Sequence, residues 1–164
     1  MTNDKTMTGD VTIRPTEPAD LPALKAVIDA ADLFPSHMLD GMAAPALDGE
    51  DRDAIWLTCD MAEPVGLAYC APEPMTDGTW NLYLIAVRPE GQGRGCGTAL
   101  VDWLQGVMQA NGARMLIVET SGAAAFKAAQ AFYLARGFER EATVRDFYGA
   151  GDDKVIYRRL IQPS

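Results

Sequence analysis

Hydrophobic residues recur along the chain with two periods, one typical of helices and one typical of strands. Helical spacing is found over 18–31, 98–111 and 124–135, with a short, irregular helical segment over 36–47. Strand-like runs cover 11–14, 55–60, 65–71, 79–87, 115–118, 139–148 and 154–160. Strands and helices interleaved in this way predict an α/β fold built on a mixed sheet.

The run 79–87 is the most strand-like segment of the chain. Both of its faces are apolar, with Leu82 and Leu84 on one face and Ile85 and Val87 on the other. A strand that is apolar on both faces is typical of the covered centre of a sheet. A glycine-rich loop follows this strand and leads directly into the helix predicted over 98–111.

Length and charge narrow the class of protein. The chain has 164 residues, the size of one domain, so we expect a flexible tail over 1–10 and a single domain over 11–164. The net charge of −9 argues against a nucleic-acid partner, because phosphate contacts require clustered Lys and Arg. No apolar run approaches the ~20 residues of a membrane span, and the polar N-terminus lacks a secretory leader.

Cysteine and histidine are few and widely spaced. Cys59, Cys70 and Cys96 form neither a disulfide framework nor a CxxC pattern, and free thiols predict a reducing, cytoplasmic location. With His37 as the one histidine, no metal site is expected.

The glycine-rich loop is the strongest indication of function. It lies between a buried strand and a helix, whose start offers unpaired N–H groups and a positive dipole end. Glycine lets a phosphate approach such amides closely, and Thr98 and Arg94 can add a hydroxyl and a charge. The loop matches neither the Walker pattern nor the dinucleotide fingerprint. A pyrophosphate cradle is therefore favoured, and a structural turn without ligand stays open.

The loop also belongs to a wider pattern. Gln92-x-x-Gly95-x-Gly97, preceded by Ile85–Ala86–Val87, resembles the acetyl-CoA loop of the GNAT family of N-acetyltransferases. Residues 131–138 are similar to the end of a helix in that family, and 13–15 with 20–21 resemble its opening strand and helix. The three matches come in the family's order and cover about 15–160.

This resemblance implies a fold and a co-substrate. The family has a mixed, mostly antiparallel, splayed sheet of six to seven strands flanked by about four helices. Pantetheine would pair with the strand at Ile85, Ala86 and Val87. The pyrophosphate of acetyl-CoA would be held by the segment made up of Gln92, Gly93, Arg94, Gly95, Cys96, Gly97 and Thr98.

The resemblance also assigns the chemistry. The family transfers the acetyl group directly to an amine, without an acyl-enzyme and without a metal. Tyr133 matches the tyrosine that protonates the departing thiolate, although helical packing alone would also explain it. Glu119, at the end of a buried strand, would take the amine proton directly or through water, or would be a solvated strand-end carboxylate.

Two positions depart from the family pattern. Many members have Glu on the central strand near Asn81, which cannot act as a base but can orient a water. Many also have Asn seven residues before the tyrosine, where this chain has Phe126. His37 lies in a region that often walls the acceptor site, and it is as easily an incidental surface residue.

The sequence thus predicts transfer of an acetyl group from acetyl-CoA to a primary amine of a small molecule or amino acid. A protein or peptide acceptor and a catalytically silent CoA-binding sensor are the alternatives. A homodimer is possible on family grounds, and the sequence does not identify the acceptor.

Overall fold

The computed structural model describes residues 6–8 and 11–163, which divide into two compact units. The first unit comprises Met1–Ala71 and Leu84–Val107, and the second comprises Pro72–Tyr83 and Met108–Ser164. Of the tail expected over 1–10, Thr6–Thr8 forms strand β1 and pairs with β2, while 1–5 and 9–10 lie outside the described residues.

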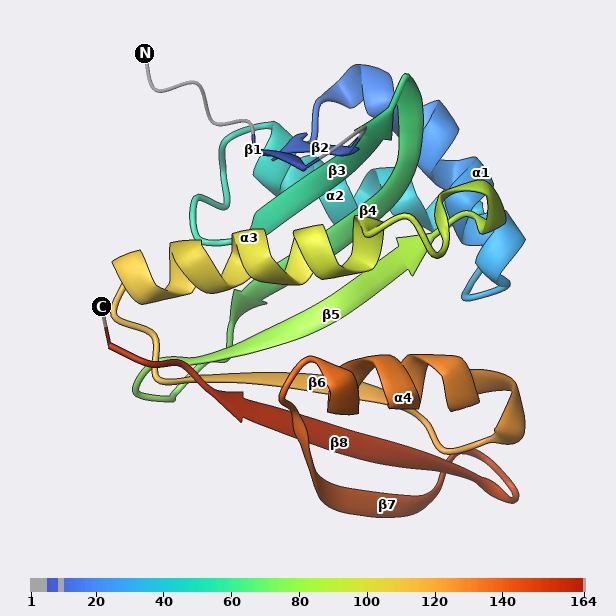
Figure 1. Ribbon diagram of the computed structural model, residues 1–164, viewed down its shortest axis with the longest axis vertical. Coiled ribbons are helices and arrows are strands. Elements are labelled where there is room, and N and C mark those ends of the chain that lie inside the picture. Colours follow the sequence, from blue (N-terminus) through green and yellow to red (C-terminus); the bar gives the residue numbers. More distant parts are fainter. Residues whose placement is uncertain (1–5, 9–10, 164) are drawn as a thin grey trace. The chain divides into compact units, whose positions relative to one another are not determined.

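The first unit holds the N-terminal strands and three helices (Figure 1). Its strands are β2 (Val11–Pro15), β3 (Ile55–Met61), β4 (Glu63–Pro72) and the later part of β5 (Thr79–Val87). Its helices are α1 (Leu21–Ala31), α2 (Leu39–Leu47) and α3 (Cys96–Ala110), whose last residues belong to the second unit. Short 3-10 turns at Pro18–Asp20, Ser36–Met38 and Pro89–Gly91 precede α1, α2 and the glycine-rich loop.

The second unit holds the C-terminal strands and one helix. Its strands are β6 (Met115–Ser121), β7 (Glu139–Gly149) and β8 (Asp152–Leu160), together with the first part of β5. Helix α4 (Lys127–Ala135) follows a 3-10 turn at Ala124–Phe126.

The sheet has the order β1-β2-β3-β4-β5-β6-β8-β7. The β5–β6 pair is parallel, whereas β1–β2, β2–β3, β3–β4, β6–β8 and β7–β8 are antiparallel. The seven strands β2–β8 and the four α-helices of the described residues confirm the predicted mixed α/β fold class. Pairing of β5 with β6 runs from Thr79–Met115 to Leu82–Val118 and stops there, although both strands continue.

The core of the first unit explains the apolar pattern of α1, α2 and β5. Leu24, Val27 and Ile28 of α1 pack against strand residues that include Trp56, Leu84 and Ala86. Helix α2 adds Leu39 and Ala43, while its neighbours Met38 and Met42 are exposed. Figure 1 shows α3 on the other side of β3 and β4 from α2. Both faces of β3 and β4 are therefore covered. The expectation that 79–87 is covered on both faces was wrong: Leu82, Leu84 and Ala86 are buried on one face, whereas on the other Tyr83 is 48% exposed and Ile85 and Val87 are only partly buried.

A buried ion-pair network fixes the beginning of the fold. The Arg14 guanidinium contacts Asp20 at 2.7 Å and Asp60 at 2.5 Å, and Thr58 donates a further hydrogen bond to Asp20. Burial alone would raise the pKa of Asp20, but the hydrogen bonds from Arg14, the Glu17 N–H and Thr58 hold it below its usual range. This carboxylate therefore ties β2 to the start of α1 and to β3.

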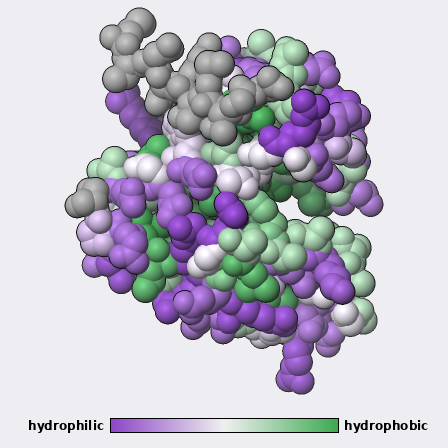
Figure 2. All heavy atoms as spheres, in the orientation of Figure 1, coloured by the Kyte–Doolittle hydropathy of each residue, from purple (hydrophilic) through white to green (hydrophobic). Residues whose placement is uncertain are grey.

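Hydrophilic and hydrophobic residues are interspersed on the face of the molecule drawn in Figure 2. On the face drawn in Figure 2, hydrophilic residues cover wide areas and hydrophobic ones occupy smaller areas between them. No helix in the described part of the chain is long and apolar enough to cross a membrane. Nor do residues 6–8 and 11–163 bring together three His, Cys, Asp or Glu side chains able to hold a metal ion.

Candidate active site

The loop between β5 and α3 has an open backbone conformation that glycine makes possible. Gly93 and Gly95 have φ values of 74° and 88°, in the left-handed region that side chains with a Cβ rarely adopt. A Cβ added at either position would meet no atom within 4 Å. These glycines are therefore required by the backbone turn and leave space beside it, as expected of a cradle for a ligand.

Helix α3 starts immediately after this turn. The N–H of Ala99 donates to the Gly95 carbonyl at 2.9 Å, so the helical hydrogen bonds begin here. Cys96, Gly97 and Thr98 then form the first turn of the helix. Their N–H groups have no hydrogen-bond acceptors within the helix. Such a turn favours an anion, and the residues present fit the pyrophosphate of acetyl-CoA.

The Gln92 side chain has a structural role. Its Nε2 donates to the Val87 carbonyl at 3.0 Å and so ties the loop back to the end of β5. The loop therefore offers its backbone to a ligand, with the exposed Arg94 as a source of positive charge.

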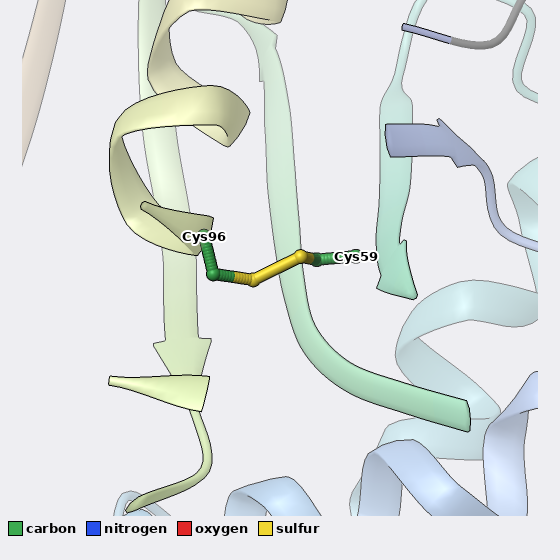
Figure 3. The surroundings of a disulfide bond; sticks show 2 residues. All are labelled: Cys59 and Cys96. Carbon is green, nitrogen blue, oxygen red and sulfur yellow. A yellow bond between two sulfur atoms is a disulfide. The ribbon is translucent and has the colours of Figure 1, made fainter. Parts of the chain in front are cut away.

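The cysteines correct a prediction. Cys59 and Cys96 form a disulfide between β3 and the first residue of α3, and only Cys70 is a free, buried thiol (Figure 3). The sequence expectation of three free thiols was therefore wrong, and with it the thiol argument for a reducing compartment. The spacing of 37 residues gave no sign of the pairing, because it depends on which strand faces α3.

Gly66 of β4 pairs with Cys59 in the sheet and lies beside the disulfide. A Cβ at Gly66 would lie 3.1 Å from the Cys96 Sγ and 3.1 Å from the Ala86 carbonyl oxygen. Because Gly66 has no side chain, the Cys96 side chain has enough space to reach Cys59 on β3.

Tyr133 of α4 is buried among aromatic rings. Its ring centroid lies 5.7 Å from those of Phe138 and Tyr157 and 5.6 Å from that of Phe132. Burial, and to a smaller extent Tyr157, raises the pKa of Tyr133 well above its usual value. Its hydroxyl has no hydrogen bond among the described residues and is not sealed from solvent. Tyr133 thus packs as a core residue and at the same time keeps a protonated hydroxyl that can donate.

Glu119 is paired. Its Oε2 lies 3.0 Å from Nζ of Lys154 on β8, a lysine that also sits 3.6 Å above the centre of the Phe147 ring. Glu119 is therefore an ion-paired carboxylate whose side chain remains 31% exposed. The sequence did not suggest Lys154, because the two residues are 35 positions apart and meet only through the β6–β8 pairing.

Asn81 and Phe126, the two positions that depart from the family pattern, differ in burial and in hydrogen bonding. Asn81 is buried on β5, with 3% of its surface exposed, and its Nδ2 donates to Glu73 at 2.8 Å. Phe126 is partly buried and is the last residue of the turn before α4, and His37 is exposed in the turn before α2. Glu73 was missed because it lies in a hairpin that reads only as Pro, Asp and Gly.

The comparisons with known proteins decide the family. The model of the acetyltransferase (GNAT) domain matches residues 51–140, more than half of the chain. The chain belongs to the GNAT acetyltransferase family. A protein from Desulfovibrio desulfuricans, described as a GNAT-family acetyltransferase, is similar at 32% identity and a TM-score of 0.80, over 93% of this chain and 99% of that one.

More distant GNAT structures share the fold. The ribosomal-protein-S18-alanine N-acetyltransferase of Escherichia coli is 23% identical, with a TM-score of 0.75 over 94% of this chain and 96% of that one. A Salmonella typhimurium acetyltransferase structure that contains acetyl-CoA is 18% identical, with a TM-score of 0.73 over 95% and 96%. No curated protein matches the chain.

Proposed function

We propose that this GNAT protein transfers an acetyl group from acetyl-CoA to a primary amine of a small molecule or amino acid. The observation that carries the proposal is the open left-handed turn at Gly93 and Gly95, directly before the first turn of α3. Amides arranged in this way suit the pyrophosphate of acetyl-CoA. The GNAT structure solved with acetyl-CoA supports the same donor.

The donor contacts follow from the strand and the loop. Backbone groups at Ile85, Ala86 and Val87 would pair with the pantetheine arm, since β5 continues to Val87 after its pairing with β6 stops at Leu82. An amide-rich arm can satisfy a strand edge of this kind. The amides of the loop from Gln92 to Thr98 would hold the pyrophosphate. Cys96 would contribute only its N–H, because its sulfur is bound to Cys59.

The chemistry needs one proton donor and one proton acceptor. The amine nitrogen attacks the thioester carbonyl, the C–S bond breaks, and Tyr133 protonates the thiolate that leaves. Its raised pKa suits this role, because the hydroxyl stays protonated throughout the neutral range. The amine proton would pass to Glu119 or to a chain of water molecules.

A protein or peptide acceptor is the second candidate. The similar solved structures include an enzyme named for ribosomal-protein-S18 alanine and an aminoglycoside 6'-acetyltransferase from the same fold. Both acceptor classes therefore belong in the test.

Calorimetric titration with acetyl-CoA tests the donor. We expect the wild type to bind and Gly95→Glu to lose at least 100-fold in affinity, since the new carboxylate repels the phosphates where screening is weak. Gly49→Glu is the matched control, because Gly49 has a φ of 80° and equally open space and lies far along the chain from the loop. Equal binding by wild type and Gly95→Glu would remove the basis of the proposal.

A panel of amines tests the transfer. Release of the CoA thiol is followed with a peptide that begins with alanine, an N-blocked lysine, a polyamine and an aminoglycoside. Acetylation of the small amines supports the proposal, and acetylation of the peptide alone favours the second candidate. Binding of acetyl-CoA without any acetylation would leave the catalytically silent sensor.

A further inference from the structure

The hairpin between β4 and β5 holds a carboxylate in a fixed position. Oε1 of Glu73 accepts a hydrogen bond of 2.8 Å from Nδ2 of Asn81 and one of 2.7 Å from the Tyr83 hydroxyl. Both donors come from β5, two residues apart, and therefore from one face of the strand. Two neutral donors thus orient a carboxylate over this face.

The backbone around Glu73 is equally restrained. Its N–H donates to the Thr79 carbonyl at 2.8 Å, and its carbonyl accepts from the Thr76 hydroxyl at 2.8 Å. The turn itself is held to the start of β6 by the N–H of Arg114, which donates to the Gly78 carbonyl at 2.7 Å. A side chain on such a support is preorganised before any ligand arrives.

Two oxygen atoms of the cluster lack partners. Oε2 of Glu73 accepts no hydrogen bond from the described residues, and none of them forms an ion pair with this carboxylate. Oδ1 of Asn81 is buried without a hydrogen-bond partner, on the same amide whose nitrogen holds Glu73. A buried polar atom without a partner is costly and uncommon in folded proteins. Because Oδ1 of Asn81 is buried, the acceptor that the cluster offers to a ligand is Oε2 of the partly exposed Glu73.

A comparison of Glu73 with Glu119 indicates which kind of hydrogen-bond donor Glu73 would bind. Glu119 already has a cation, Lys154, at 3.0 Å. Glu73 has an oriented carboxylate and no cationic partner within residues 6–8 and 11–163, which suits a ligand that carries a positive charge and several N–H groups. A primary ammonium ion has both.

We propose that Glu73 is the catalytic carboxylate that binds the acceptor's ammonium group and takes its proton, with Asn81 and Tyr83 as positioning residues. The inference rests on the proposed acetyl transfer. One proton moves from the ammonium nitrogen to Oε2, which leaves a neutral amine and a carboxylic acid. The amine then forms the C–N bond as the C–S bond breaks, and the departing thiolate takes a proton from Tyr133. The second proton lost by the nitrogen returns to Tyr133 through water, and the Glu73 acid releases its proton to solvent.

The position along β5 agrees with this role. Asn81, Tyr83 and Ile85 alternate onto the same face of the strand. An arm held by the backbone at Ile85, Ala86 and Val87 would run along β5, the strand that also carries Asn81 and Tyr83. The acceptor class that the Glu73 carboxylate favours is a cationic primary amine.

The test is Glu73→Gln, which keeps the oxygen that accepts from Asn81 and Tyr83 and removes the charge. Acetyl-CoA and a peptide with N-terminal alanine, or whichever panel amine the wild type acetylates best, serve as probes. At pH about 7 we expect kcat/KM to fall about 100-fold or more, with the affinity for acetyl-CoA unchanged. At about 1.5 pH units above the pKa of the probe amine, which is pH about 9.5 for an α-amine of pKa about 8, the amine is already neutral, so the loss shrinks.

Three controls make the result decisive. Asp77→Asn removes the same charge from the same hairpin at a side chain that is 99% exposed, and should leave kcat/KM unchanged. Glu73→Asp should recover part of the activity lost in Glu73→Gln. Tyr83→Phe removes one orienting donor and should lower kcat without abolishing the pH dependence.

The outcomes separate this inference from the proposed function. A loss of less than about tenfold in Glu73→Gln, or an equal loss at both pH values, would overturn the role of Glu73 as the base. Acetyl transfer by the wild type would then still stand, with Glu119 or water as proton acceptor. A wild type that binds acetyl-CoA and acetylates no amine contradicts both.

Discussion

In the first unit, the candidate site for acetyl-CoA is formed mainly by the backbone. A left-handed turn and a helix start form the loop, and the Cys59–Cys96 disulfide attaches that helix start to β3. In the second unit, the corresponding features are side chains that contact residues of a distant segment: Tyr133 packs against Tyr157, and Glu119 pairs with Lys154. Substitutions in the first unit should therefore change stability and donor binding, and those in the second should change turnover.

The largest effect is expected from Tyr133→Phe in the second unit. Without the hydroxyl, the departing thiolate has no positioned acid, so kcat should fall about 10²- to 10⁴-fold. The ring still fills the aromatic cluster, so the melting temperature and the calorimetric affinity for acetyl-CoA should stay close to those of the wild type. Steady-state kinetics and calorimetry on the same preparation check both. A full retention of kcat would make Tyr133 a packing residue only.

Reduction of the Cys59–Cys96 disulfide should have the largest effect on the first unit. By the chain-entropy model, a closed loop of this length is worth about 3 to 4 kcal/mol of unfolding free energy. Acetyl-CoA should also bind more weakly, because Cys96 is the first residue of α3 and loses its attachment to β3. Urea unfolding and calorimetry with and without reductant measure these changes.

Cys96→Ser serves as the control for reduction, because it should show no dependence on reductant. The buried Cys70 gives an internal check, since it should react with thiol reagents only after unfolding. Identical unfolding curves for the oxidised and reduced wild type would mean that the cross-link does not stabilise the first unit.

A smaller effect is expected from Gly66→Ala. The added methyl group would lie 3.1 Å from both the Ala86 carbonyl and the Cys96 Sγ, so the strand and the cross-link must shift. Overpacking of this kind costs about 1 to 3 kcal/mol. Urea unfolding measures the loss, and Gly106→Ala on the open surface of α3 is the control, with no atom within 4 Å of its Cβ. An unchanged stability would show that β4 yields easily at this point.

The smallest effect is a pH dependence that belongs to Asp20. Its pKa is lowered in the folded protein, so its contribution is present above the unfolded value of about 3.9 and is lost as the pH falls through the folded value. Asp20→Asn should therefore reduce the loss of unfolding free energy that the wild type shows as the pH falls into the acidic range. Near neutral pH, the dependence of the unfolding free energy on pH should be the same in both proteins. Urea midpoints measured between about pH 3 and about pH 7 test this, and parallel curves would contradict it.

The sequence predicted those parts of the fold that depend on local pattern. The apolar run 79–87 became strand β5, although only one of its faces is well buried, and the alternating glycines became an open turn before a helix. Helix α3 begins two residues earlier than expected, at Cys96, because the backbone turn is completed at Gly95. The strand expected over 139–148 became β7 (Glu139–Gly149), which lies at the edge of the sheet, where charged residues are tolerated.

What the sequence could not predict depends on contacts between distant segments. The disulfide requires β3, β4 and α3 to be adjacent, and Lys154 reaches Glu119 only through the register of β6 and β8. Glu73 lies in a hairpin whose composition indicates a turn and nothing more. Residues from distant segments determine whether a carboxylate is ion-paired or is accessible to a ligand. The roles of the acidic residues were therefore the least predictable part of the site.

Gly66 has a consequence for how this sequence can change over generations. Part of the space that excludes a larger residue there is occupied by the sulfur of Cys96, so the two positions are not independent. A substitution at Gly66 should be tolerated more readily in a lineage that has already lost Cys96 than in one that retains it. The order in which the two changes arise, and not only their identity, would then determine which descendants remain folded.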